Sequence, residues 1–374
     1  MRPERPLSAR ERLAWLRLSR TPRVGPLTFQ RLLARFRDAE AALEALPRLG
    51  RTRFEPWPRD AAERELASLE RLGARLLAAC EPDYPRLLKS LSCPPPVIAL
   101  RGDLRLLEKP TVALVGAREA SAAGLKLAED LARGLGEAGV TVVSGLARGV
   151  DAAAHRASLA SGTVAVLAGG LAHPYPPQNL GLHEEIVARG VVVSEAPVGV
   201  VARGRDFPRR NHIISGLSLG VVVVEAALRS GSLITARAAA EQGREVMAAP
   251  GSPLDPRARG GNALLKEGAA LIESAEDILA HIRAAPRALR VDPTPPLFEE
   301  EAETAPDAAM LDRVAALLSP TPVHLNTLAR LTGAGASALA AAVMELELDG
   351  RAVSLTGGYV VSQPAALGGS YASD

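Results

Sequence analysis

The chain has 374 residues, of which 47% are hydrophobic and 3% aromatic, and its formal net charge is +2. This composition excludes global disorder and provides an aliphatic core large enough for two or three domains. The sequence has no apolar run of membrane-spanning length and no apolar signal segment, and its two cysteines do not make a zinc site. We therefore expect a soluble cytoplasmic protein with no metal and no cofactor.

Charged residues are unevenly distributed along the chain, which indicates separate modules. Residues 1–110 hold 22 basic and 14 acidic residues, and residues 111–285 hold 17 of each. Residues 286–374 hold 5 basic and 11 acidic residues. A basic module can contact nucleic acid, whereas an acidic one is repelled by its phosphates.

Residues 1–110 are predicted to form a helical module with basic faces. The turn at 24–26 precedes apolar residues at helical spacing, namely Leu27, Leu32, Leu33 and Phe36. A glycine turn that opens such a helix resembles half of a helix-hairpin-helix motif or a SAM-like bundle, modules that bind the DNA backbone or other proteins. An ordinary helical bundle remains the alternative. Three prolines at 94–96 mark the exit from this module.

Residues 111–285 alternate short Val-rich runs with helical segments, for example 121–138 and 232–242. The runs lie at 112–115, 140–143, 163–167, 191–193, 221–224 and 246–248. Uninterrupted apolar runs of this length are typical of parallel strands that are buried on both faces. The pattern predicts a Rossmann-like, doubly wound α/β domain with right-handed crossovers, whose ligands gather at the carboxyl ends of the strands.

The last part of the chain is predicted to hold a linker and a small domain. Residues 286–306 contain five prolines and five acidic residues, which favours an extended linker. Residues 307–374 predict three helices and a short hairpin around 356–358, the arrangement of a winged helix. The third predicted helix has no Lys or Arg between residues 337 and 347. We therefore favour protein contact or a structural role for this domain over DNA reading.

Two glycine turns each follow a predicted strand and open a predicted helix. The turn at 116–121 carries Arg118 and offers Ser121 as a helix N-cap, and the turn at 144–149 carries Arg148. Backbone N–H groups and the helix dipole bind anions at such turns, and arginine adds a fork of donors for phosphate oxygens. Neither turn is a dinucleotide fingerprint or a Walker A loop, which argues against NAD binding and ATP hydrolysis.

Three residues, Asp151, His155 and Glu225, have both a catalytic and a structural interpretation. Asp151 and His155 lie four residues apart on one predicted helix face, so they could form an acid/base pair. We favour Asp151 as a cap that orients Arg148, and His155 as a packed or surface residue. Glu225 follows a strand directly and could be catalytic, but we favour a role in holding a loop by hydrogen bonds. The next turn, at 230–232, is again compatible with an anion.

The segment 203–212 combines four arginines with Phe207. Arginines hold phosphates and an exposed aromatic ring can stack on a base, so this mixture suits single-stranded nucleic acid. A solvated basic loop is the alternative interpretation, which becomes weaker beside two turns that favour phosphates.

Together these motifs resemble those of the DprA/Smf family, the DNA-processing proteins of bacterial natural transformation. The resemblance covers residues 111–285. It rests on VGAREAS at 115–121, SGLARGVDAAAH at 144–155, AVLAGGLAHPYPPQN at 165–179, FPRRNHIISGLS at 207–218, SGSLITARAAAEQGREVMAAPG at 230–251 and GGNALLKEGA at 260–269. The flanking modules are similar in kind to the SAM-like and winged-helix domains of many members.

The resemblance implies a mediator that binds single-stranded DNA (ssDNA) without catalysis, forms a homodimer through its α/β domain and loads RecA. Arg118 matches the family's phosphate-contacting arginine. The DNA- or phosphate-binding residues that the resemblance and the turns indicate are Gly116, Arg118, Ser121, Gly145, Arg148, Phe207, Arg209, Arg210 and Asn211. Many members have an arginine where this chain has His212, and many have an aromatic residue where it has Ala196. Some members have a basic residue where it has Pro177. Each departure removes a possible DNA contact, and the basic N-terminal module is expected to compensate.

Two other classes of function remain. A nucleoside-monophosphate phosphoribohydrolase has a related fold, but it carries a Pro-Gly-Gly-x-Gly-Thr turn before its catalytic glutamate, and this chain has no such turn. A protein-interaction scaffold would show no salt-dependent binding of nucleic acid. Duplex binding, the dimer interface and the surface that contacts RecA are left open by the sequence.

Overall fold

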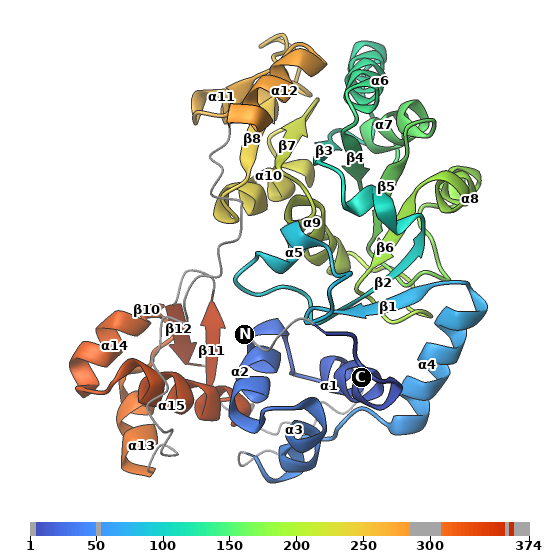
Figure 1. Cartoon of the computed structure of the whole chain (residues 1–374). Coiled ribbons are helices and arrows are strands. Elements are labelled where there is room, and N and C mark those ends of the chain that lie inside the picture. The colour runs from blue at the N-terminus through green and yellow to red at the C-terminus, as the bar shows by residue number, and fades with distance from the viewer. Residues whose placement is uncertain (1–4, 50–53, 285–307, 356–358, 363–374) are drawn as a thin grey trace, which may run out of the picture. The chain divides into compact units, whose positions relative to one another are not determined.

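The computed structural model describes residues 5–49, 54–284, 308–355 and 359–362 (Figure 1). The chain divides into two compact units. The larger unit comprises residues 2–13 and 59–292, and the smaller one comprises residues 14–58 and 293–374.

A nine-stranded sheet forms the centre of the larger unit, in the order β1-β2-β6-β5-β4-β3-β7-β8-β9. The strands are β1 (Arg75–Ala78), β2 (Val97–Gly102), β3 (Thr111–Val115), β4 (Thr141–Ser144), β5 (Thr163–Leu167), β6 (Val191–Ser194), β7 (Gly220–Val223), β8 (Glu245–Ala248) and β9 (Ala270–Leu271). The seven strands from β6 to β9 are parallel, whereas β2 pairs antiparallel with both β1 and β6. The predicted doubly wound sheet is confirmed.

Helices cover both faces of this sheet because its central strands are apolar on both sides. In β3, Val112 and Leu114 pack into one apolar cluster, and Ala113 and Val115 pack into another on the opposite face. The first cluster includes residues of α6 (Ala122–Glu137), α7 (Val150–Ser158) and α12 (Ala275–Ala284). The second includes residues of α5 (Arg86–Lys89), η2 (Leu104–Leu107), α9 (Asp206–Gly216) and α10 (Ser232–Glu241), with α11 (Arg259–Lys266) packed against it. The larger unit further contains α4 (Arg59–Arg71), η3 (Pro177–Asn179) and α8 (Leu180–Arg189).

The direction of strand addition reverses at β3. The chain runs outward from β3 through β4 and β5 to β6, and then returns to place β7 on the other side of β3. Connections after β3 and β7 therefore leave on opposite sides, which opens a crevice at their carboxyl ends. Ligands of open α/β sheets bind at such a switch point.

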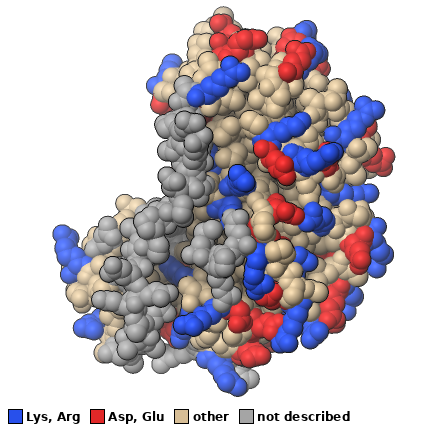
Figure 2. Space-filling view, in the orientation of Figure 1, with Lys and Arg blue, Asp and Glu red and all other residues tan. Residues whose placement is uncertain are grey.

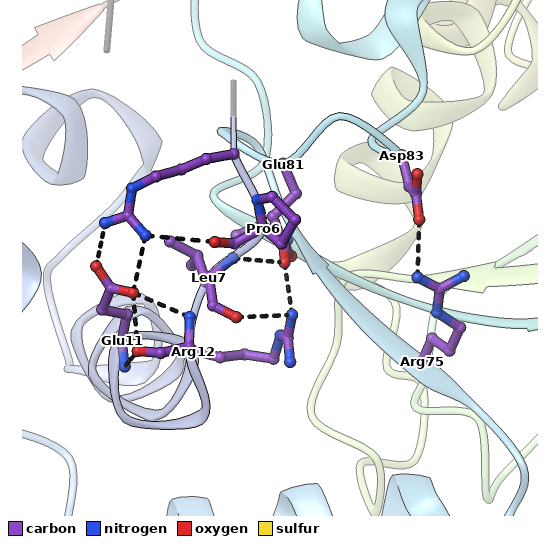
Figure 3. A network of polar contacts seen from close by, with 10 residues as sticks. Pro6, Leu7, Glu11, Arg12, Arg75, Glu81 and Asp83 are labelled. Carbon is purple, nitrogen blue, oxygen red and sulfur yellow. Dashed lines mark hydrogen bonds and ion pairs between the residues drawn. The ribbon is translucent and has the colours of Figure 1, made fainter. Parts of the chain in front are cut away.

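The start of the chain is tied to the loop after β1 by the buried carboxylate of Glu81. Glu81 accepts hydrogen bonds from the backbone N–H groups of Leu7 (3.1 Å) and Ala78 (2.9 Å), and from the guanidinium of Arg12. Figure 3 shows Leu7 and Arg12 converging on this carboxylate. A buried carboxylate is tolerated here because charged and backbone donors satisfy it.

The expected boundary at residue 110 is wrong. Residues 75–102 do not belong to a helical N-terminal module, because β1 and β2 extend the main sheet. Both strands are short apolar runs, and the segment between them contains Tyr84, whose buried hydroxyl donates to the carbonyl of Pro95 (2.7 Å). The three prolines thus lead into a strand of the α/β unit. The predicted linker 286–306 lies outside the described residues.

The smaller unit contains two groups of helices. Its N-terminal part holds the second half of α1 (Ala9–Arg20), α2 (Pro26–Phe36), α3 (Ala39–Ala45) and η1 (Leu46–Arg48). Its C-terminal part holds α13 (Ala308–Leu317), α14 (Leu325–Thr332) and α15 (Ala336–Leu348) with a sheet of β10 (Val323–His324), β11 (Ala352–Leu355) and β12 (Tyr359–Ser362). Three helices and a small antiparallel sheet confirm the winged helix, although the turn residues 356–358 are outside the described range. None of the described helices is long and apolar enough to cross a bilayer.

Candidate nucleic-acid interface

The first glycine turn connects β3 to α6 and packs tightly against the start of α7. A Cβ atom at Gly116 would lie 2.6 Å from a methyl carbon of Val150, so only glycine fits there without displacing its neighbour. Ser121 caps α6 as predicted, since its Oγ accepts a hydrogen bond from the N–H of Gly124 (2.9 Å). Arg118, between these two positions, is exposed.

Glu225, directly after β7, holds the start of α6. Its carboxylate accepts hydrogen bonds from the backbone N–H of Ser121 (2.9 Å) and from the Ser121 hydroxyl. The favoured interpretation of Glu225 as a loop-holding residue is confirmed. A negative carboxylate already occupies the N-terminus of α6, where the sequence favoured an external anion. The positive charge that this turn offers to a ligand therefore comes from Arg118.

The second turn, between β4 and α7, is also satisfied from within. The Asp151 carboxylate accepts hydrogen bonds from the N–H groups of Gly145 (3.1 Å) and Ala147 (3.3 Å), and Asp151 is buried. Asp151 therefore holds the turn before α7, but it does not cap the helix, whose N-cap residue is Gly149. Arg148 extends from the same turn, is exposed and lies 3.9 Å from the carboxylate of Glu119.

His155 is fully buried and is held as a neutral ring. Its Nε2 accepts the N–H of Leu146 (3.3 Å), so Nδ1 carries the proton and donates to the hydroxyl of Thr163 (2.8 Å). Burial, with the nearby charge of Arg210, lowers the pKa of His155 to about 3. Of the two expected positions for His155, packed or at the surface, the structure shows the packed one.

Arg210 is buried beside the second turn and connects it to β5. Its guanidinium donates to the carbonyl oxygens of Gly145 and Val166 (3.1 Å for the second), and the residue is 6% exposed. Burial lowers the pKa of Arg210 to about 10, against the opposing effect of Asp151. Burial raises the pKa of Asp151, and the charge of Arg210 opposes that rise. Arg210 is thus a buried cation beside a buried carboxyl group, and its Nε has no hydrogen-bond partner.

Phe207 brings two guanidinium groups together. The guanidinium carbons of Arg118 and Arg210 lie 5.2 Å and 5.5 Å from the centre of its ring. The ring of Tyr175 meets Phe207 edge-on, with 6.1 Å between centres. Cation–π contacts at these distances are attractive and leave the N–H groups of a guanidinium available to phosphate oxygens.

These residues border two adjoining cavities at the carboxyl ends of β3, β4 and β7. The larger cavity is about 780 Å³ and is open to solvent. Its basic lining residues are Arg118, Arg148, Arg210, Arg229 and Arg257. The smaller cavity is about 250 Å³ and lies between Arg118, Tyr175 and Phe207. The crevice that the strand order predicts is therefore present and is lined with cations.

The structure brings most of the sequence-predicted site residues together. The cavities are lined by Gly116, Arg118, Gly145, Arg148, Phe207, Arg210 and Asn211. Asn211 is 8% exposed and donates to the carbonyl of Gly231 (3.2 Å), so it holds the loop before α10. Ser121 does not line either cavity. Arg209 does not line them either, and its exposed guanidinium forms a forked ion pair with the buried carboxylate of Glu195.

The sequence interpretation missed Tyr175, Arg229 and Arg257 as cavity-lining residues. A signal existed for the two arginines, because Arg229 follows β7 at the switch point and Arg257 follows the neighbouring parallel strand β8. Tyr175 lies far from the turns in sequence, and only a folded loop brings it to Phe207. That loop is fixed by Asn179, whose amide donates to the carbonyls of Leu146 (2.9 Å) and Ala147 (3.1 Å).

Charge at the surface is otherwise mixed. Figure 2 shows basic and acidic side chains interspersed over the visible face. Since charges of both signs largely cancel at a distance, attraction for a polyanion has to come from local groups such as the arginines of the cavity. Among the described residues, no group of three His, Cys, Asp or Glu side chains could hold a metal ion.

Three comparisons with known proteins agree with this geometry. The family model of DNA recombination-mediator protein A matches residues 75–283, a DprA-like N-terminal HHH domain matches residues 9–68, and a DprA winged helix domain matches residues 298–358.

Known proteins are similar to the chain over 56–82% of its length. Protein Smf of Escherichia coli is 37% identical over 82% of this chain and 83% of its own length. The X-ray structure of DNA processing protein A from Streptococcus pneumoniae matches with a TM-score of 0.61 at 32% identity, covering 71% of this chain and 95% of that one. The protein from Helicobacter pylori, solved to explain its ssDNA binding mode, matches with a TM-score of 0.52 at 28% identity, covering 56% of this chain and 95% of that one.

Proposed function

Because the chain belongs to the DNA recombination-mediator protein A family, we propose that it binds ssDNA in the arginine-lined cavity of its α/β unit. The observation that supports this most is the group formed by Arg118, Arg148 and Phe207 beside an open cavity of about 780 Å³. Guanidiniums neutralise phosphates, and aromatic rings receive bases of any sequence. The H. pylori relative is described as binding ssDNA.

The residues of the cavity divide into two kinds in this proposal. Arg118, Arg148 and Phe207 contact the strand directly. Gly116, Ser121, Gly145, Arg210 and Asn211 shape the turns that carry these contacts, through the hydrogen bonds and close packing described above. Arg209, with Glu195, fixes α9 and offers its remaining exposed surface to a longer strand.

Fluorescence titration of a labelled ssDNA oligomer tests the assignment of Arg118. Arg118→Ala should weaken binding about tenfold or more for every sequence, since a charge-assisted hydrogen bond contributes about 1.5–3 kcal/mol. Arg156→Ala removes an exposed arginine from α7 that lines neither cavity, and it should bind as the unmodified chain does. Equal affinities of both variants would refute the assignment.

The chain acts in this proposal as a mediator in the cytoplasm and not as an enzyme. It hands ssDNA to RecA during transformation and recombination, as a homodimer through its α/β unit. RecA filament formation on a short oligonucleotide should be faster with the chain than without it, and mass measurement in solution should give a dimer. Release of free base from nucleoside monophosphates above the blank would instead favour the phosphoribohydrolase alternative, with Glu225 and Asp151 as the first residues to change.

A further inference from the structure

The third helix of the winged-helix domain, α15, has an unusual surface. In helix-turn-helix proteins that read DNA, the recognition helix enters the major groove and supplies the contacts to the bases. Here α15 has no Lys or Arg, and its last two turns carry Glu345 and Glu347. Carboxylates on this helix would repel a DNA backbone, so its surface fits a basic partner.

A basic helix lies against these carboxylates within the smaller unit. Arg31 and Arg35 of α2 are four residues apart and therefore lie on one helix face. Arg31 forms an ion pair with Glu347 (2.7 Å), and Arg35 forms one with Glu345 (3.3 Å). The four side chains are only 15–30% exposed, so the contact shields them substantially from water.

Met344 adds an apolar contact to the two ion pairs. It is 4% exposed and belongs to the apolar cluster of the N-terminal helices, which includes Phe29 and Leu32 of α2. The cluster of the winged helix itself contains Leu339, Val343 and Leu346 instead. Met344 is thus a side chain that one module inserts into the core of another, as an interface residue does.

We propose that α15 is a docking surface for α2 of the same chain, and that docking shields Arg31 and Arg35 from nucleic acid. Residues 14–58 carry nine basic and four acidic residues, and residues 293–374 carry three basic and ten acidic ones, so these two parts of the smaller unit attract each other. Because both modules belong to one chain, their high effective concentration lets a small contact persist. The winged helix therefore limits the access of phosphates to the basic N-terminal module.

Hydrogen exchange of the full chain without DNA tests docking separately from the proposed function. Glu345→Gln/Glu347→Gln should raise amide exchange in α2 and in the second half of α15 about fivefold, the effect of losing two partly exposed ion pairs. Glu184→Gln/Glu185→Gln, on exposed positions of α8, makes the same charge change and should leave both helices unaffected.

A charge swap tests whether the ion pairs themselves hold the two helices together. The variant that combines Arg31→Glu/Arg35→Glu with Glu345→Arg/Glu347→Arg should restore protection of both helices from exchange. Unchanged exchange, or protection that depends on protein concentration, would overturn docking within one chain.

Titration with ssDNA then tests shielding. In an Arg118→Ala background, Glu345→Gln/Glu347→Gln should increase affinity several-fold more than Glu184→Gln/Glu185→Gln does, with a steeper dependence on salt. Adding Arg31→Ala/Arg35→Ala should remove the gain. Equal affinity of the two glutamine pairs would overturn shielding.

Discussion

Arg210 shows how a single residue can be both buried and important to the cavity. Its position on α9 is three and four residues before Ile213 and Ile214, which are buried, so the helical period directs all three to the interior. There the guanidinium supports the carbonyls of Gly145 and Val166 and balances the charge of Asp151. The second glycine turn and β5 are thus held together by one internal cation.

Replacing Arg210 should therefore destabilise the fold. Arg210→Ala leaves Asp151 buried without its counter-charge, and we expect the free energy of unfolding to fall by about 3–5 kcal/mol. Urea denaturation at neutral pH measures this change. Arg205→Ala, which removes an exposed arginine just before the same helix, should change it by no more than about 0.5 kcal/mol. A similarly small effect for Arg210→Ala would contradict the buried network.

His155 should make stability depend on pH. Its pKa is about 3 in the folded chain against an ordinary value of 6.5, because the ring is buried and the nearby charge of Arg210 disfavours a second proton. A lowered pKa means that, as the pH falls, the unfolded chain takes up the proton before the folded chain does. The contribution of the neutral ring to the free energy of unfolding is therefore full above pH 6.5 and is lost as the pH falls toward 3. In urea denaturation at pH 7.5 and 5.0, His155→Gln should lose less stability on acidification than the unmodified chain or the exposed control His173→Gln. Equal losses in all three would contradict a neutral buried ring.

At the scale of elements, the loop after β7 fastens α6 to the sheet. Glu225 reaches Ser121, which is 104 positions earlier in the sequence, and packs beside Gly124, where a Cβ atom would come within 2.5 Å of the carboxyl carbon. The helix N-terminus and the switch point are thus joined by one carboxylate. This arrangement keeps the turn that carries Arg118 in a fixed position relative to β3 and β7.

Removing this carboxylate should loosen the first turn of α6. Glu225→Ala should lower the free energy of unfolding by about 1–3 kcal/mol, since two charge-assisted hydrogen bonds are lost. Thermal denaturation compared with Glu184→Ala, an exposed control on α8, gives the difference. No difference between the two would mean that the bonds to Ser121 do not stabilise the fold.

The elements also show what the sequence can predict. All six Val-rich runs are strands of the parallel sheet, because a strand buried on both faces leaves a continuous apolar run in the sequence. By contrast, β1, β2 and β9 were not predicted. β1 and β2 are short apolar runs, which do not distinguish a strand from a buried helix, and β9 is only two residues long and takes its conformation from sheet pairing. The turns were predicted from their glycines. Their internal partners, Glu225 and Asp151, were predicted only as holding or capping residues, since sequence spacing cannot show which N–H groups a carboxylate reaches.

At the scale of the whole molecule, the proposed binding of DNA depends on a local group of cations in a chain of nearly neutral charge. The net charge is +2 and acidic residues almost balance basic ones, so long-range attraction for DNA is weak. Guanidiniums gathered at the carboxyl edge of the sheet have to supply the affinity. Each phosphate that they neutralise releases counterions, which makes affinity sensitive to salt.

The most direct test is the salt dependence of binding to a labelled ssDNA oligomer and to a duplex of the same length. We predict that the chain prefers ssDNA, and that the logarithm of its affinity falls with the logarithm of salt concentration by about 0.7 for each phosphate neutralised. Arg118→Ala should reduce that slope by about 0.7, the value for one phosphate. No binding at low salt, or a slope that Arg118→Ala leaves unchanged, would contradict the assignment of the cavity to single-stranded DNA.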